Sequence, residues 1–134
     1  MIGLVICTHS NMAGGLKDAV EMIAGVNDHL CALGFYGDEQ LTEYGDRIKA
    51  AVEGFPEGAV IITDMLNATP YNAALYAIAH TKHVVVTGAS LPLVLELLIK
   101  AQYTAADPET LASEVLAAKT EYSRLTCSRD IFNY

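Results

Sequence analysis

Four short apolar runs, each followed by a segment with helical spacing of apolar residues, constrain the fold more than any other feature of this chain. The runs are GLVIC, HLCALGF, AVIIT and HVVVT, at residues 3–7, 29–35, 59–63 and 83–87. Continuous apolar runs of this length are typical of strands that are buried on both faces of a sheet. Strands that alternate with helices predict a doubly wound α/β fold, in which a mostly parallel sheet of four strands carries helices on both faces.

The segments between the runs carry apolar residues three or four positions apart, as amphipathic helices require. Leu16, Val20 and Ile23 mark the first helix. Ser10 and Asn11 are good candidates for its N-cap, because their side chains can accept hydrogen bonds from backbone N–H groups. Further helices are expected over residues 41–52, 70–78, 91–101 and 108–119.

The C-terminal tail EYSRLTCSRDIFNY, residues 121–134, has a weaker pattern. Residues 122–127 alternate only weakly between apolar and polar and are rich in polar groups. Two interpretations stay open: this segment adds a fifth strand at a sheet edge, or it pairs with a second subunit.

Length and composition indicate one domain over residues 1–134. A chain of this length can bury one substantial core. Its 52% of apolar against 18% of charged residues favours a folded core over disorder. The net charge of −8 argues against a nucleic-acid partner and favours a basic protein partner.

The sequence also argues against several classes of site. Glycine, proline or charged residues interrupt the long apolar segments, and the N-terminus lacks a signal-peptide pattern, so we expect a cytoplasmic protein. Cys7, Cys31 and Cys127 have neither metal nor redox spacing. We expect no metal site and no cofactor, because the chain shows no zinc pattern and no dinucleotide-binding glycine loop.

The expected sheet points to one edge as the place where a ligand binds. In doubly wound sheets, ligands lie beyond the carboxyl ends of the strands, near a switch in strand order. This rule selects the loops 9–14, 64–70 and 88–92. His9 follows the first strand and Asp64 ends the third, so their side chains meet if those strands are neighbours. A carboxylate bonded to one ring nitrogen fixes the tautomer and leaves the other nitrogen free as a nucleophile.

The residues around this pair favour an anionic ligand. Ser10 lies near the start of the first helix, and Asn67, Ala68 and Thr69 precede the third helix. Helix N-termini carry free N–H groups and the positive end of the helix dipole, and the Thr69 hydroxyl adds a donor. A phosphoryl group on an imidazole is an anion that such a site would stabilise. The residues therefore predict a phosphohistidine at His9.

Three stretches of the chain, in order, also match a known pattern. GLVICTHSNMAGGLKDAVEMIAG covers residues 3–25, DMLNATPYN covers residues 64–72 and VVTGASLPLVLEL covers residues 85–97. They resemble, respectively, the active-histidine segment, the aspartate and serine turn, and the V-x-T-G-x-N-L-P segment of one family. That family is the enzyme IIA components of the mannose class of the bacterial phosphoenolpyruvate-dependent sugar phosphotransferase system. The resemblance covers essentially the whole chain.

The resemblance implies roles for individual residues and for partners. His9 would accept a phosphoryl group from the phosphocarrier protein HPr and pass it to a IIB component during carbohydrate uptake, with the membrane IIC and IID components as indirect partners. Asp64 would bond the ring, and Thr69 takes the position of the family's serine, which helps to hold the phosphoryl group. The family also forms homodimers, which gives the tail a role in exchange between subunits.

The chain departs from the family pattern in its turns. Ser10 stands where a glycine usually follows the histidine, and Asn67 and Ala68 replace two glycines. If this turn needs a positive φ, asparagine adopts it at low cost and alanine does not. The His9 and Ser10 pair also resembles the multiphosphoryl subunit of dihydroxyacetone kinase. Two alternatives therefore stay open: the phosphoryl-donor subunit of such a kinase, and a non-catalytic regulatory module on the same fold.

Overall fold

The computed structural model describes residues 1–118 and 122–132, and it contains all four predicted strands. They are β1 (Gly3–His9), β2 (Leu30–Phe35), β3 (Ala59–Thr63) and β4 (Val84–Thr87). β1 is two residues longer than predicted, because Thr8 and His9 continue the ladder opposite Gly34 and Phe35 of β2. His9 is therefore the last residue of a strand rather than part of a loop.

The sheet is entirely parallel, with the strand order β2-β1-β3-β4. β1 lies between β2 and β3, so the chain leaves β1 toward one side for β2 and crosses to the other side for β3. This is the switch in strand order that places a ligand site beyond β1 and β3. The predicted α/β class and parallel sheet are confirmed.

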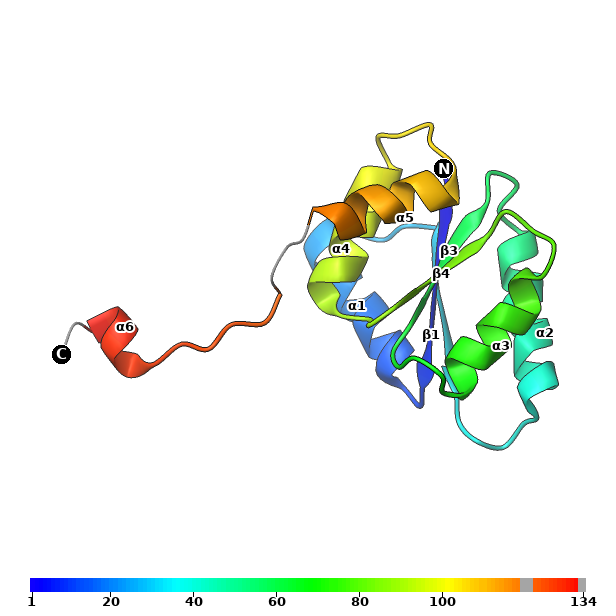
Figure 1. The fold of residues 1–134 in the computed structure, drawn as a ribbon, viewed down its shortest axis with the longest axis horizontal. Coiled ribbons are helices and arrows are strands. Elements are labelled where there is room, and N and C mark those ends of the chain that lie inside the picture. Colours follow the sequence, from blue (N-terminus) through cyan, green and yellow to red (C-terminus); the bar gives the residue numbers. More distant parts are fainter. Residues whose placement is uncertain (119–121, 133–134) are drawn as a thin grey trace.

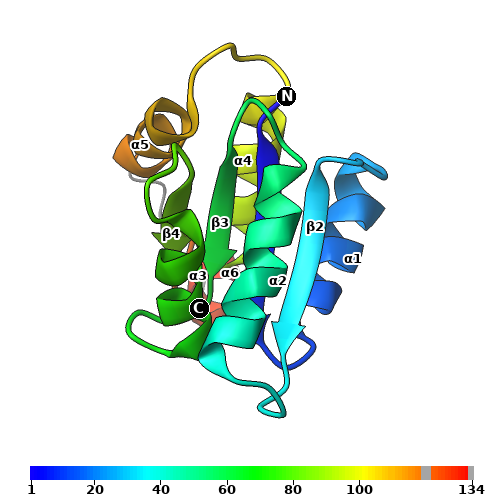
Figure 2. The same cartoon turned by 90° about the vertical axis from the view of Figure 1, so that its right-hand side faces the viewer.

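Helices cover both faces of the sheet, as predicted (Figure 1). Figure 2 shows α2 and α3 in front of the sheet, whereas α1, α4 and α5 lie behind it. The bounds of these helices are α1 (Met12–Ala24), α2 (Leu41–Glu53), α3 (Thr69–Ile78), α4 (Leu91–Ala101) and α5 (Pro108–Ala117). Residue 119, where the last helix was expected to end, lies outside the described residues.

The apolar core has two layers, one on each face of the sheet. Leu4 and Ile6 of β1 point to the layer formed with α1, α4 and α5. Val5 and Cys7 point to the layer formed with α2 and α3. Successive residues of a strand face opposite sides, so the continuous apolar runs fill both layers.

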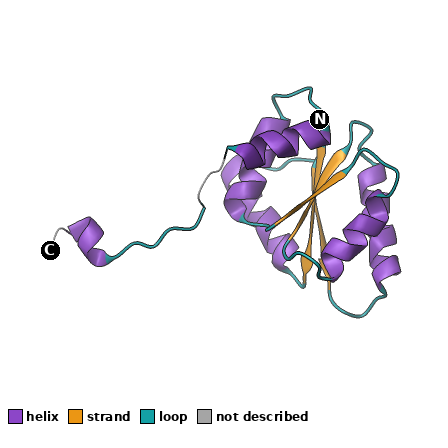
Figure 3. Cartoon of the chain, viewed as in Figure 1, coloured by secondary structure: helices purple, strands orange, loops and turns teal. Residues whose placement is uncertain are grey.

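The C-terminal tail is the least predictable part of the described chain. Residues 122–127 form no strand within the single chain, and a short helix, α6 (Ser128–Phe132), follows them. Figure 3 shows these residues as a loop and a helix that extend from the body of the molecule. The fifth strand is thus not seen at these residues, whereas pairing with a second subunit stays a prediction.

Two further observations concern the described residues as a whole. None of their helices has the length and the apolar character needed to cross a bilayer. In the same residues, no three histidine, cysteine, aspartate or glutamate side chains gather as a group that would hold a metal ion.

Candidate functional site

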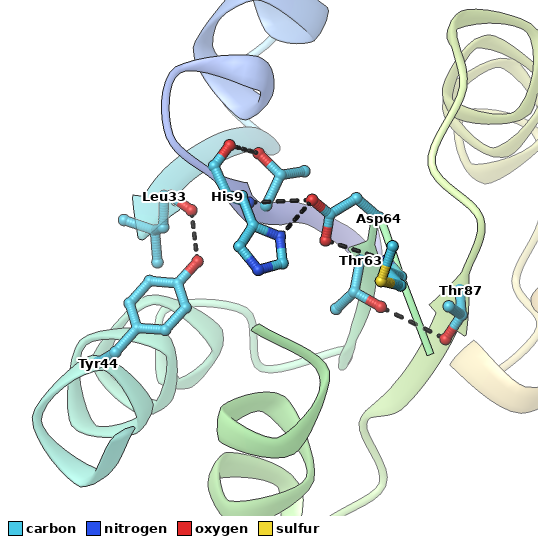
Figure 4. Close-up of polar contacts among 8 residues, drawn as sticks. His9, Leu33, Tyr44, Thr63, Asp64 and Thr87 are labelled. Carbon is cyan, nitrogen blue, oxygen red and sulfur yellow. Dashed lines mark hydrogen bonds and ion pairs between the residues drawn. The ribbon is translucent and has the colours of Figure 1, made fainter. Parts of the chain in front are cut away.

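The structure brings His9 and Asp64 together at the carboxyl edge of the sheet. β1 and β3 are neighbours, with Cys7 opposite Thr63, so His9 and Asp64 emerge side by side. The His9 ring nitrogen Nδ1 lies 2.8 Å from Asp64 Oδ2 (Figure 4). The His9 backbone N–H donates to the same oxygen over 3.0 Å. One carboxylate oxygen therefore fixes both the backbone and the ring of His9.

Asp64 is held as a carboxylate. The side chain of Asp64 is 13% exposed, and its second oxygen, Oδ1, accepts a hydrogen bond of 3.0 Å from the Met65 N–H. Partial burial pushes the pKa of Asp64 up, but the hydrogen bonds from the His9 ring and backbone, with the charge of His9, hold it below the usual value. An ionised carboxylate only accepts hydrogen bonds, so the ring must carry its proton on Nδ1.

The other ring nitrogen of His9 is available for chemistry. With the proton on Nδ1, the lone pair of Nε2 lies on the side of the ring away from Asp64 (Figure 4). The His9 side chain is 48% exposed, which leaves it accessible to a partner. A partly buried carboxylate behind an accessible imidazole nitrogen is the arrangement that nucleophilic catalysis by histidine needs.

Ser10 makes the turn that follows the histidine. Its φ is +51°, a left-handed conformation in which glycine is favoured. Its N–H donates to the Phe35 carbonyl of β2 over 2.7 Å. A Cβ atom at Gly34 would lie 2.3 Å from the Ser10 carbonyl oxygen, so the close approach of the Ser10 turn to β2 requires a glycine at this position.

The turn between β3 and α3 lacks glycine but still has one residue with a positive φ. Asn67 has a φ of +64°, whereas Ala68 has an extended backbone with φ −91° and ψ 174°. The left-handed position thus falls on asparagine, which tolerates it, and not on alanine. The Asn72 side chain stabilises this turn, because its Nδ2 donates to the Asn67 carbonyl over 3.3 Å.

α3 begins at Thr69, one residue before the predicted start at Pro70. Ala68 is the N-cap and has no side-chain acceptor, so the N–H groups of the first turn receive no cap. Asn11 occupies the N-cap of α1, as one of the two predicted candidates, but its side chain makes no capping bond either. No hydrogen bond joins Thr69 to His9 within the described residues.

The third predicted loop, residues 88–92, adjoins β3 instead of His9. Thr63 is buried, and its hydroxyl donates to the Thr87 hydroxyl over 3.3 Å (Figure 4). The Thr63 carbonyl also accepts hydrogen bonds of 2.9 Å from the N–H groups of Gly88 and Ala89. This loop therefore braces the strand that carries Asp64.

Sequence reasoning did not single out Phe35, Met65 or Leu66 as residues of the site. Phe35 pairs with His9 across β1 and β2, and its ring lies 6.4 Å from the His9 ring at an angle of 78°. Met65 and Leu66 are exposed next to Asp64. An aromatic residue at the end of the neighbouring parallel strand was the available signal for Phe35, but the register that pairs it with His9 was not known.

Known proteins are similar in sequence to most of this chain. The profile of a family described as PTS system fructose IIA component matches residues 3–115. A sorbose-specific EIIA component from Lacticaseibacillus casei is 33% identical over 122 residues, covering 90% of this chain and 87% of the relative. A fructose-specific EIIA component from Bacillus subtilis is 31% identical over 101 residues, covering 73% and 69%.

Solved structures agree in fold. A phosphotransferase system component EIIA from Streptococcus agalactiae has a TM-score of 0.78 at 23% identity, covering 88% of this chain and 92% of that chain. A putative phosphotransferase system permease from Klebsiella pneumoniae has a TM-score of 0.75 at 25% identity, covering 98% and 93%. The match of the family profile to residues 3–115, together with the curated relatives, places the chain in the mannose-class EIIA family of the sugar phosphotransferase system.

Proposed function

We propose that this protein is a phosphoryl carrier in which His9 accepts a phosphoryl group from HPr and passes it to a IIB component for carbohydrate uptake. The observation that carries the proposal is the 2.8 Å bond between His9 Nδ1 and Asp64 Oδ2, which leaves Nε2 as the nucleophile. Membership of the EIIA family supports the same assignment.

The proposed transfer is a single displacement at phosphorus. The Nε2 lone pair of His9 attacks the phosphorus of the phosphorylated donor and forms an N–P bond. The bond between phosphorus and the donor atom breaks, and its electron pair stays with the donor. The proton remains on Nδ1, where the Asp64 carboxylate stabilises the positive charge that the ring acquires. Transfer to the acceptor reverses these roles.

The surroundings of His9 suit a phosphoryl group. The uncapped N-termini of α1 and α3 both begin at the carboxyl edge of the sheet, beyond β1 and β3. We assign the phosphoryl oxygens to the hydroxyls of Ser10 and Thr69 and to the backbone N–H groups of Asn67, Ala68 and Thr69. Partial positive charge and hydrogen-bond donors at such helix ends stabilise phosphate groups.

The partners follow from the same surface. Exposed Met65 and Leu66 beside Asp64 offer apolar contact to a docking protein, and the net charge of −8 favours a partner with a basic face. The transfer would take place in the cytoplasm, with the IIC and IID components acting only through IIB. We also propose a homodimer, in which the exposed Leu125, Ile131 and Phe132 of the tail contact the second subunit.

A reconstituted phosphorelay tests the proposal. The purified chain is incubated with phosphoenolpyruvate, enzyme I and HPr, and its mass is measured before and after mild acid treatment. We expect an acid-labile phosphoryl increment in the parent and in His29→Gln, a matched histidine variant, but not in His9→Gln. The same increment in His9→Gln, or none in the parent, contradicts the proposal.

A second candidate is the phosphoryl-donor subunit of a dihydroxyacetone kinase. The observation that favours it is Ser10, which follows His9 where the sugar-specific family usually has glycine, and which takes the left-handed φ of +51°. The phosphorylated chain distinguishes the two when it is offered either IIB proteins or the dihydroxyacetone-binding kinase subunits. Loss of the label to the kinase subunits alone favours the second candidate. A chain that takes no phosphoryl group at all would be a regulatory module on this fold.

A further inference from the structure

We propose that Phe35 is a positioning residue that fixes the plane of the His9 ring for phosphoryl transfer, an inference that rests on the proposed function. The Phe35 and His9 rings meet edge to face, with their centroids 6.4 Å apart and their planes at 78°. The bond from Nδ1 to Asp64 anchors one edge of the imidazole. Phe35 supplies a second contact that limits how the ring turns about that bond.

The backbone of Phe35 also holds the backbone around His9 in place. Phe35 lies opposite His9 in the parallel ladder, and its carbonyl accepts the Ser10 N–H over 2.7 Å. The same residue therefore holds the turn that follows His9 and the ring that His9 presents. A ring held by these two contacts keeps Nε2 oriented toward an incoming phosphorus and lowers the entropic cost of each transfer.

Phe35 is itself held by Tyr44 of α2. The two rings lie 5.2 Å apart, and Tyr44 is fully buried. The Tyr44 hydroxyl donates to the Leu33 carbonyl of β2 over 2.6 Å (Figure 4). The Arg47 guanidinium lies over the Tyr44 ring, 5.4 Å from its centre. In the view of Figure 4, Tyr44 and Asp64 lie on opposite sides of His9. Tyr44 reaches the histidine through Phe35, whereas Asp64 bonds it directly.

A second histidine and phenylalanine pair offers a matched control. The rings of His29 and Phe55 lie 5.7 Å apart with a tilt of 35°. Phe55 follows α2, in the connection to β3, whereas Phe35 ends β2. Both phenylalanines are half-buried. Replacing either one removes a ring of the same size beside a histidine, but only Phe35 contacts the histidine that carries the proposed chemistry.

The kinetic test measures phosphorylation of the full chain by phosphorylated HPr in the parent, Phe35→Leu, Phe35→Tyr and Phe55→Leu. We expect kcat to fall about two- to tenfold in Phe35→Leu, the fold-change that matches the strength of an edge-to-face aromatic contact. KM for HPr should be unchanged, and Phe35→Tyr, which keeps the ring, should retain the parent rate. A parent-like rate in Phe35→Leu, or an equal loss in Phe55→Leu, overturns the inference.

A second measurement does not depend on phosphoryl transfer. The ¹⁵N shifts of the His9 ring report which nitrogen carries the proton and whether the two forms exchange. We expect a dominant Nδ1–H form in the parent, in Phe35→Tyr and in Phe55→Leu, and shifts averaged toward the other form in Phe35→Leu. Unchanged shifts in Phe35→Leu reject the positioning role. If the parent is not phosphorylated, the proposed function fails, and these shifts still decide whether Phe35 positions the ring.

Discussion

The two helices that begin beside His9, α1 and α3, differ from α4 and α5 in how the N–H groups of their first turns are satisfied. The N-caps of α1 and α3 are Asn11 and Ala68, and neither makes a side-chain capping bond. The N-caps of α4 and α5 are Ser90 and Asp107, whose side chains accept hydrogen bonds from the N–H groups of Leu93 and Thr110.

Under the proposed function, this difference distinguishes helix ends that are capped for stability from helix ends that bind the phosphoryl group. A side-chain cap stabilises a helix by satisfying a backbone N–H group that otherwise has no partner. α4 and α5 therefore gain stability from their own sequence. α1 and α3 leave their donors free at the place where β1 and β3 present His9 and Asp64. We interpret the free donors as the anion site, kept open for the phosphoryl group.

The largest expected effect on phosphorylation comes from changing Asp64, the carboxylate that lies beside the uncapped helices α1 and α3. Asp64→Asn should lower the rate of His9 phosphorylation by about 10²-fold or more, since an amide neither favours the Nδ1–H form nor stabilises a charged ring. Single-turnover phosphorylation measures this rate. Asp46→Asn, which changes a surface carboxylate bonded to Tyr76, should leave the rate unchanged. A parent rate in Asp64→Asn would remove this residue from the mechanism.

Adding a cap to α3 should turn a functional helix end into a structural one. Ala68 already has the extended backbone of an N-cap, so Ala68→Asp should raise the free energy of unfolding by about 0.5–2 kcal/mol. The added charge competes for the N–H groups and repels the phosphoryl group, so phosphorylation should slow about tenfold. Urea denaturation and the transfer assay measure the two effects. Ala68→Ser adds a capping side chain without a charge, so it separates the effect of the cap from that of the charge. Unimpaired transfer in both variants would argue against an anion site at the start of α3.

Removing the cap of α4 should lower stability and leave phosphorylation unchanged. Ser90→Ala should lower the free energy of unfolding by about 1 kcal/mol, because the Leu93 N–H loses its acceptor. Phosphorylation of His9 should stay at the parent rate below the unfolding temperature. Thermal denaturation and the transfer assay together check this prediction. A loss of transfer without a loss of stability would show that α4 belongs to the site.

The smallest expected effect concerns pH at the opposite end of the sheet. The Ala59 N–H donates to His83 Nδ1 over 3.0 Å, and burial, together with the charge of Lys82, holds the pKa of His83 below its usual value. The folded protein thus binds fewer protons at His83 than the unfolded chain does. Its contribution to stability is present above about pH 6.5, the ordinary histidine value, and is lost as the pH falls below it.

Urea midpoints at pH 7 and pH 5.5 measure this contribution. His83→Gln keeps an acceptor for the Ala59 N–H but does not titrate, so the midpoint of this variant should fall less on acidification than that of the parent. His80→Gln alters an exposed histidine and should follow the parent. Equal falls in the parent and in His83→Gln would exclude His83 as the source.

The sequence predicted the strands and helices well because each apolar run fills both core layers at once. It also predicted that His9 and Asp64 would meet, since parallel neighbours bring their carboxyl ends to one edge. It could not decide how the turn at Asn67 and Ala68 would be built, because the sequence does not show whether the left-handed position falls on Asn67, which tolerates it, or on Ala68, which does not.

Contacts that depend on the register of the strands could not be predicted from the sequence. Phe35 faces His9 only because β1 extends to residue 9 and pairs in register with the end of β2. The tail was ambiguous for a different reason, since its weak pattern offers no face to bury within the single chain. Local propensity could not foresee α6 there, in a segment with no buried residue.

The position of the phosphoryl group on the histidine tests the central claim most directly. ³¹P and ¹⁵N NMR of the chain phosphorylated through HPr would identify the ring nitrogen that carries phosphorus. The account predicts phosphorus on Nε2 of His9 and a proton retained on Nδ1, bonded to Asp64. Phosphorus on Nδ1, or on another residue, would contradict it.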